Sequence, residues 1–131
     1  MSELFREALN AKSLIDRLSR TTEFRATTIV TAEELLRGRL AQTAKARSSD
    51  SLIESYARLH ATLAGLKNFK MLPFDGDAVR TFDQLRRQSL GVGTMDLRIA
   101  AIAIANDATL LSRNLRDFGR VPGLTVEDWL Q

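Results

Sequence analysis

The sequence predicts an α/β fold in which a mainly parallel sheet is covered by helices on both faces. Short apolar, β-branched runs alternate along the chain with segments of helical periodicity, and one of these helical segments is apolar all round. Parallel strands need crossover connections, usually helices, and are therefore buried on both faces. No repeat or linker divides the 131 residues, so we expect residues 1–131 to form a single domain.

The first quarter of the chain predicts helix, strand and helix in that order. Residues 3–20 have apolar side chains at helical spacing, in one helix or two. Residues 27–31 are Thr, Ile or Val throughout, which favours a short buried strand. A helix over 32–40 should follow, because Thr31 and Glu34 have the spacing of a capping box.

A polar loop at 48–51 precedes the clearest amphipathic pattern in the chain. Apolar residues then recur at steps of four and three, which predicts a helix with one apolar face: Leu52, Tyr56, Leu59, Leu63 and Leu66. We expect this stripe to form either core or a dimer surface. A second short strand is predicted over 69–74, ending near Pro73.

The second half of the chain continues the alternation. A helix opens at Asp75 or Gly76, with four apolar residues facing inward: Val79, Phe82, Leu85 and Leu90. Residues 108–112 and 124–126 predict a third and a fourth strand, and Pro-Gly at 122–123 marks a turn between them.

The most informative segment is residues 91–105, a glycine-containing turn followed by an almost wholly apolar helix. Such a helix is expected to be buried. Thr94 is a suitable N-cap, and Asp96 stands in the first turn, where the helix dipole favours a negative charge. Capping alone is enough to explain an acid at this position.

Composition excludes several kinds of protein. The chain has no cysteine and one histidine, His60, so thiolate and multi-histidine metal sites are excluded. No apolar run approaches the roughly 20 residues of a membrane span, and the first residues lack the apolar core of a signal peptide, so we expect a cytoplasmic protein. The net charge is +3, and fifteen of the 19 cations are arginine, which permits an anionic partner without requiring one.

Oxygen-bearing side chains follow the expected strands. Glu34 follows the first strand, Asp96 opens the apolar helix, and Asn114 and Asp117 follow the strand ending at Ser112. In a parallel α/β sheet, ligands gather beyond the carboxyl ends of the strands. Oxygen donors of this kind suit Mg²⁺ or Mn²⁺, which would assist hydrolysis of a phosphodiester.

Three segments of the chain resemble the PIN-domain family, and its VapC toxin branch in particular. The second acidic motif is similar to TIVTAEELLRG at 28–38, the third to GTMDLRIAA at 93–101, and the closing segment to LLSRNLRDF at 110–118 together with later residues. The resemblance covers residues 24–131. It implies a three-layer α/β/α fold and a Mg²⁺-dependent (or Mn²⁺-dependent) endoribonuclease of a type II toxin–antitoxin pair, with RNA as substrate, a cognate antitoxin, homodimer formation and no membrane.

The resemblance also assigns site residues. Glu34, rather than Glu33, matches the family's glutamate, and Asp96 matches the third acid. Asn114 falls at the fourth position, with Asp117 as the alternative. All four are therefore candidate catalytic and metal-binding residues. Further candidates for contact with RNA or antitoxin lie close by in the sequence: Arg98, Ser112, Arg113 and Arg116.

The start of the chain departs from the family pattern. The family opens with a central strand ending in an aspartate ligand, and residues 1–6 resemble what normally follows that strand. Asp16 lies within a helical pattern and is a poor substitute. Either the start is misassigned and the working protein is longer, which we favour, or the chain is a damaged or repurposed copy.

We therefore expect a ribonuclease whose activity in this form is weak or absent. The alternative is a non-catalytic PIN-like binding module that keeps the antitoxin or partner surface. Each candidate residue also has a structural explanation: Glu34 as a capping acid, Asn114 and Asp117 as turn formers, and the arginines as solvated charges.

Overall fold

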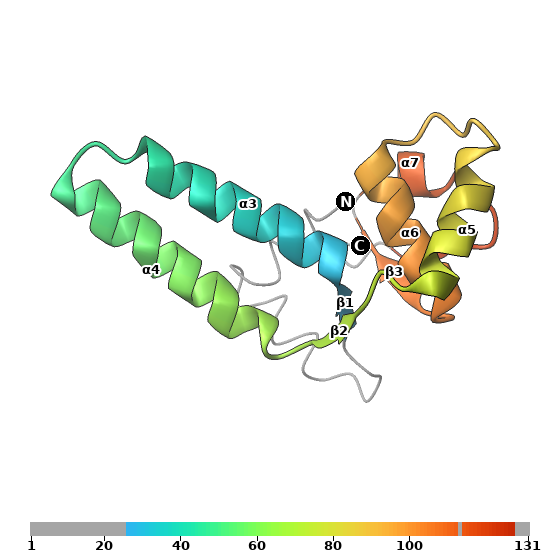
Figure 1. The fold of residues 1–131 in the computed structure, drawn as a ribbon, viewed down its shortest axis with the longest axis horizontal. Helices are drawn as coiled ribbons and strands as arrows, with labels where there is room; N and C mark the ends of the chain where they lie inside the picture. The colour runs from blue at the N-terminus through green and yellow to red at the C-terminus, as the bar shows by residue number, and fades with distance from the viewer. Residues whose placement is uncertain (1–25, 113, 128–131) are drawn as a thin grey trace.

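The computed structural model describes residues 26–112 and 114–127 (Figure 1). The expected helices at 3–20, together with Asp16 and Arg113, lie outside the described residues. Four strands and five helices are described, in the order β1 (Ala26–Thr28), α3 (Ile29–Lys45), α4 (Ser49–Leu66), β2 (Lys70–Leu72), α5 (Gly76–Arg86), α6 (Thr94–Ala105), β3 (Thr109–Leu111), α7 (Leu115–Phe118) and β4 (Thr125–Glu127).

The strands pair in two parallel ladders, as the alternation of strand and helix predicts. Strand β1 pairs with β2, with Ala26 opposite Lys70, and β3 pairs with β4, with Thr109 opposite Thr125. Within residues 26–112 and 114–127 no strand joins the two ladders into one sheet. Helix α6 contacts both β1 and β3, so one helix covers strands from both ladders.

Helix α6 is the centre of the core, and its prediction as a buried helix is confirmed. It packs chiefly against α5, and the side chains of Ile99, Ala100, Ala101 and Ile102 are completely buried. Phe118 of α7 is buried in the same cluster. A helix that is apolar on all sides can only be stable when other elements surround it.

Two N-caps differ from the predicted ones. The hydroxyl of Thr28 accepts a hydrogen bond from the Thr31 backbone N–H at 2.9 Å, so α3 begins at Ile29 and the predicted capping box of Thr31 and Glu34 is wrong. The strand ends early because Thr28 satisfies an orphan N–H of the first helical turn. In α6 the N-cap is Gly93, and the predicted cap Thr94 is already the first helical residue.

Helices α3 and α4 form an antiparallel hairpin that projects away from α5, α6 and α7 (Figure 1). The capping box that opens α4 joins Ser48 and Ser51. Most of the predicted apolar stripe of α4 is not core, because Leu52, Tyr56 and Leu63 are 40%, 58% and 46% exposed, whereas Leu66 at its end is buried. The alternative role expected for this stripe, a dimer surface, stays a prediction.

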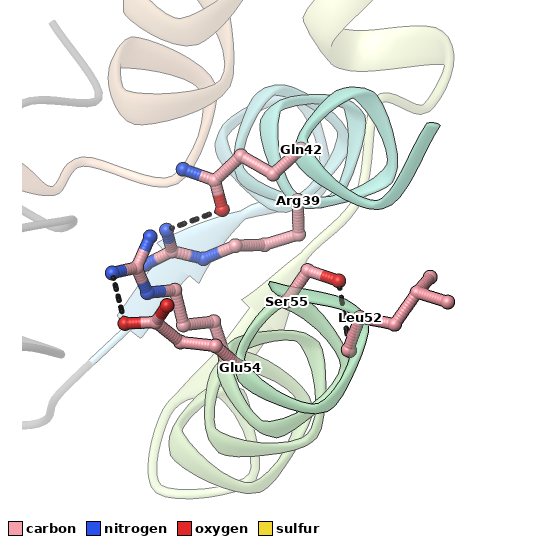
Figure 2. A network of polar contacts seen from close by, with 6 residues as sticks. Arg39, Gln42, Leu52, Glu54 and Ser55 are labelled. Atoms are coloured by element: carbon pink, nitrogen blue, oxygen red, sulfur yellow. Dashed lines mark hydrogen bonds and ion pairs between the residues drawn. The ribbon is translucent and has the colours of Figure 1, made fainter. Parts of the chain in front are cut away.

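Polar side chains occupy much of the contact between the two hairpin helices. Ser55 and Thr62 are the buried residues of the middle of α4. The Nε of Arg39 donates to the Thr62 hydroxyl at 2.9 Å. Nη1 of the same arginine donates to the Gln42 side-chain oxygen at 3.3 Å, as Figure 2 shows. Tertiary packing therefore leaves Leu52, Tyr56 and Leu63 exposed and buries the small polar residues Ser55 and Thr62.

Helix α5 is confirmed with one exception. Phe82 and Leu85 are buried and Leu90 is packed against the core, but Val79 is 38% exposed rather than inward. None of the helices within residues 26–112 and 114–127 is long and apolar enough to cross a bilayer.

Candidate functional site

The topology directs three segments toward the carboxyl ends of the strands. Helix α3 begins directly after β1, and the short helix α7 follows β3 by three residues. Helix α6 leads back into β3 through a tight turn, so its N-terminal end lies toward the end where β3 finishes. The candidate residues Glu34, Asp96 and Asn114 lie on or next to these three segments.

Glu34 lies in the second turn of α3. Its side chain is partly buried, and one carboxylate oxygen, Oε1, is shielded from solvent. The neighbouring Glu33 is exposed instead, and its Oε2 forms an ion pair with Arg37 Nη2 at 2.6 Å. The two neighbouring glutamates therefore stand in different environments.

Asp96 stands in the first turn of α6 and is partly buried. No side-chain hydrogen bond caps this helix at Gly93. An acidic side chain at a helix N-terminus interacts favourably with the helix dipole. Helix α3 contacts α6, so the elements that carry Glu34 and Asp96 lie against each other.

Asn114 and Asp117 form a local hydrogen-bonded unit around the start of α7. Asn114 is the N-cap: its Oδ1 accepts from the Asp117 backbone N–H at 3.3 Å, and its Nδ2 donates to Asp117 Oδ2 at 3.1 Å. The Asn114 backbone N–H donates to the hydroxyl of Ser112 at 2.9 Å. Ser112 is fully buried, so this hydrogen bond fixes the start of the turn against the protein interior.

The arginines near the rim differ in their surroundings. Arg98 is partly buried, with its guanidinium 5.8 Å from the centroid of the Phe82 ring. Arg116 is exposed on α7. Arg120 was not among the sequence candidates, yet it donates to the Gly91 carbonyl at 3.3 Å and lies 4.0 Å from Asp117. The sequence feature that could have identified Arg120 is its position three residues after Asp117, within reach of an ion pair.

The donor set fits a hard divalent cation in kind but is incomplete in number. Glu34 and Asp96 supply carboxylates, and Asn114 supplies an amide oxygen, which are ligands that Mg²⁺ accepts. However, within residues 26–112 and 114–127 no group of three or more His, Cys, Asp or Glu side chains is gathered closely enough to hold a metal ion. The described residues alone therefore do not build a complete site.

The family comparison covers most of the chain. A family model described as "PIN domain" matches residues 1–124. Ribonuclease VapC2 of Rickettsia felis is 44% identical over 46 residues, which are 35% of this chain and 34% of the relative. The tRNA(fMet)-specific endonuclease VapC of Salmonella typhimurium is 32% identical over 68 residues, 49% of this chain and 52% of the relative. The chain thus spans about a third to a half of the length of these curated relatives.

A solved structure shows the same fold. The crystal structure of VapBC2 from Rickettsia felis bound to a DNA fragment from their promoter matches with a TM-score of 0.76 and 24% sequence identity. The match covers 98% of this chain and 95% of the chain in that structure. At this level of identity the likeness shows the architecture, an α/β fold with parallel strands.

Proposed function

Because this chain belongs to the PIN-domain family, we propose that it is an endoribonuclease toxin of a type II toxin–antitoxin pair, acting in the cytoplasm. The observation that carries the proposal is the family match over residues 1–124, and the two relatives named as VapC nucleases support it. The partners we propose are an RNA substrate, a cognate antitoxin and a second copy of the chain.

We propose Glu34 and Asp96 as the carboxylates that hold Mg²⁺ or Mn²⁺, with Asn114 or Asp117 completing the set. The partial burial of both carboxylates and the contact between α3 and α6 support this assignment. A bound divalent ion supplies Lewis-acid stabilisation of the charge that develops on a phosphodiester. Arg98 and Arg116 are proposed contacts for RNA phosphate or antitoxin carboxylate, since guanidinium pairs with either.

The activity of this chain is proposed to be weak or absent. With Asn114 completing the set, two carboxylates and an amide give a divalent cation fewer anionic ligands than three acids would, and the described residues gather no group of three acids. Fewer carboxylates lower cation affinity, and with it the occupancy on which hydrolysis depends.

A cleavage assay with the purified chain, Mg²⁺ and initiator tRNA tests this proposal; the tRNA is chosen because one relative is named for tRNA(fMet). Asp96→Asn and Glu34→Gln should abolish whatever cleavage is seen. Glu33→Gln is the matched control, since Glu33 is the exposed neighbour of Glu34. Robust cleavage by the wild type would overturn the low-activity prediction, and cleavage that survives both site variants would overturn the site.

The second candidate function is a non-catalytic PIN-like module that keeps a partner surface. The lack of a three-acid group among the described residues and the exposed apolar side chains of α3 and α4 favour it. Under this alternative, Asp96→Asn changes no measurable RNA cleavage, and a peptide from an antitoxin encoded next to this gene raises the melting temperature. Cleavage of the tRNA that is lost in Asp96→Asn but kept in the Glu33→Gln control would argue against this alternative.

A further inference from the structure

The positive charge of this protein is concentrated on the outer part of the α3–α4 hairpin. Residues 37–58 contain five lysine or arginine residues and two acids, a surplus of three positive charges. The whole chain has a net charge of +3, so the rest of the sequence is balanced in charge. A local surplus of this kind attracts anions, and it attracts a polyanion most strongly.

The cations at the end of the hairpin are open to solvent. Lys45 is the last residue of α3 and Arg47 lies in the link to α4, and both are exposed. Within the described part of the chain, neither side chain forms an ion pair or a hydrogen bond. Of the two acids, Glu54 is held by Arg58 at 3.1 Å, and Asp50 stands in the first turn of α4, where the helix dipole favours it. The charges of Lys45 and Arg47 therefore remain available to a partner.

The cations on the two helices share one side of the hairpin. Figure 2 shows Gln42 and Glu54 on this side and the side chain of Leu52 pointing to the other. Lys45 follows Gln42 by three residues, and Arg58 follows Glu54 by four. Both cations therefore lie on the same side as Gln42 and Glu54, because residues three or four apart are neighbours on a helix surface.

Lys45 and Arg58 also lie at nearly the same height along the hairpin. The hydrogen bond from Arg39 to Thr62 sets these two residues at one level of the antiparallel helices. Arg58 precedes Thr62 by four residues, so it is level with a point two residues before Lys45, about 3 Å away along the axis. We call the surface formed by Lys45, Arg58 and the adjoining Arg47 the basic end.

The basic end is remote from the candidate site. Lys45 follows Glu34 by eleven residues in the same helix, which is about 16 Å along its axis. In Figure 1 the hairpin projects away from α5, α6 and α7, so its end is the part of α3 and α4 farthest from them. A ligand that touches both places must therefore be large.

The chemistry of this side of the hairpin favours a nucleic-acid backbone over a protein. Leu52 and Tyr56 are exposed on the other side, so the basic end is without the apolar and aromatic anchors that dominate protein interfaces. It offers donors instead: the two cations, and the side-chain amide of Gln42, whose oxygen already accepts from Arg39. Lysine, arginine and glutamine side chains are common donors to phosphate oxygens.

The same residues favour helical over single-stranded RNA. Proteins bind single strands by stacking bases on aromatic rings. Tyr56 is the one aromatic ring among the large hydrophobic side chains that are exposed in the described residues, and it lies on the side of Leu52. Helical RNA is bound mostly through its shape, by contacts to phosphate and 2′-hydroxyl groups, which need donors and no aromatic platform.

We propose that the basic end binds the phosphate backbone of a helical segment of RNA, as a second contact remote from the candidate site. The choice of RNA rests on the proposed nuclease function, whereas the position of the contact rests on the hairpin. Because its contacts are with phosphates, the basic end adds affinity without reading the base sequence.

Fluorescence anisotropy with a labelled RNA hairpin of about 16 base pairs, the span of a double-stranded-RNA module, tests the proposal. The protein is titrated in EDTA at several salt concentrations, so that binding is measured without cleavage. Removing both cations at the tip, with Lys45→Ala and Arg47→Ala together, should raise the dissociation constant about tenfold. It should also lower the steepness of log K against log salt by about 1.8, because two phosphate contacts are lost.

Lys67→Ala with Arg87→Ala is the matched control. It also removes one lysine and one arginine, both exposed and both at helix C-caps, from the ends of α4 and α5 nearer the candidate site. The salt dependence should then stay that of the wild type. Circular dichroism checks that both double variants keep the fold.

Equal loss of affinity in the two double variants would overturn the proposal, because the RNA would then respond to net charge alone. Tight binding of an unpaired RNA strand of the same length, with the same dependence on Lys45 and Arg47, would exclude the preference for helical RNA. Displacement of the RNA hairpin by polyglutamate as effectively as by unlabelled RNA would show that the basic end takes acidic protein instead.

The binding assay contains no divalent cation and does not measure cleavage, so the two proposals fail separately. RNA binding that depends on Lys45 and Arg47 in a chain that cleaves no RNA would refute the nuclease and keep the basic end. Cleavage of tRNA together with binding that ignores both residues would refute the basic end alone.

Discussion

The side-chain amide of Asn114 donates to Asp117 Oδ2 at 3.1 Å, and the Asp117 backbone N–H donates to Asn114 Oδ1 at 3.3 Å. This reciprocal pair starts α7 and ties together two residues that the sequence offers as alternative metal ligands. Both have a structural function in the chain, whether or not either binds metal.

Asn114→Ala removes the N-cap of α7. We expect it to lower the free energy of unfolding by about 1 kcal/mol, because one orphan backbone N–H of the helix loses its acceptor. Urea denaturation measures the change. Asn114→Ser is the control, since its hydroxyl can still accept from the Asp117 N–H without placing a second carboxylate beside Asp117 Oδ2; equal destabilisation by both variants would contradict the capping role.

Thr28→Ala should destabilise the protein by about 0.5–2 kcal/mol, the usual cost of losing a threonine cap. Thr28 is buried, and its hydroxyl also lies 3.0 Å from that of Thr31. Thr28→Ser keeps the hydroxyl and should recover most of the loss in thermal or urea unfolding. If Thr28→Ser is as unstable as Thr28→Ala, the lost methyl group and not the cap explains the effect.

Ile102→Ala should cost about 2–5 kcal/mol, and Ile102→Val about 0.5–1.5 kcal/mol, because Ile102 is completely buried in α6 and its removal leaves a cavity. Ile53→Ala, at a side chain that is 70% exposed on α4, is the comparison and should stay within about 0.5 kcal/mol of the wild type. A similar loss for Ile53 and Ile102 would mean that α6 is not the centre of the core.

Two glycine replacements should have opposite signs. Gly38 is exposed within α3, and a Cβ added there would meet nothing within 4 Å, so Gly38→Ala should stabilise by about 0.5–1 kcal/mol. Gly123 has φ +81°, and Gly123→Ala should destabilise by about 1–2 kcal/mol through backbone strain. Melting temperatures that move in the same direction would contradict this assignment.

Mg²⁺ should stabilise this chain only slightly. With a dissociation constant at or above the working Mg²⁺ concentration, linkage gives at most about 0.4 kcal/mol. Thermal unfolding with and without Mg²⁺ measures this stabilisation, and Asp96→Asn should abolish the dependence of the melting temperature on Mg²⁺. A shift of several degrees that depends on Asp96 would show that the chain binds the ion tightly as it stands.

Much of the local structure follows from the sequence. The buried helix α6, the short strands and the hairpin helices α3 and α4 were all predicted, because apolar periodicity and β-branched runs are local signals. The errors fall at helix starts and faces. Thr28 rather than Thr31 caps α3, and Val79 is exposed, because the choice between neighbouring hydroxyls or faces depends on what packs against them.

For the candidate site the sequence supplies a set of residue types, which stays a prediction, but not their geometry. Positions after strands and at a helix start made Glu34, Asp96 and Asn114 candidates. In the structure Ser112 is fully buried, and Arg120, which was not a candidate, forms an ion pair with Asp117. Ion pairing across a turn depends on side-chain direction, which sequence spacing constrains only weakly.

Residue order alone is enough to predict most helices and strands, the burial of α6 and the family to which the chain belongs. The direction in which α4 faces is different, because it was set by long-range packing: Thr62 is turned toward Arg39 while Tyr56 remains in solvent. An amphipathic pattern specifies that a helix has an apolar side, but the surface that covers that side is decided by how the other elements of the fold pack around it.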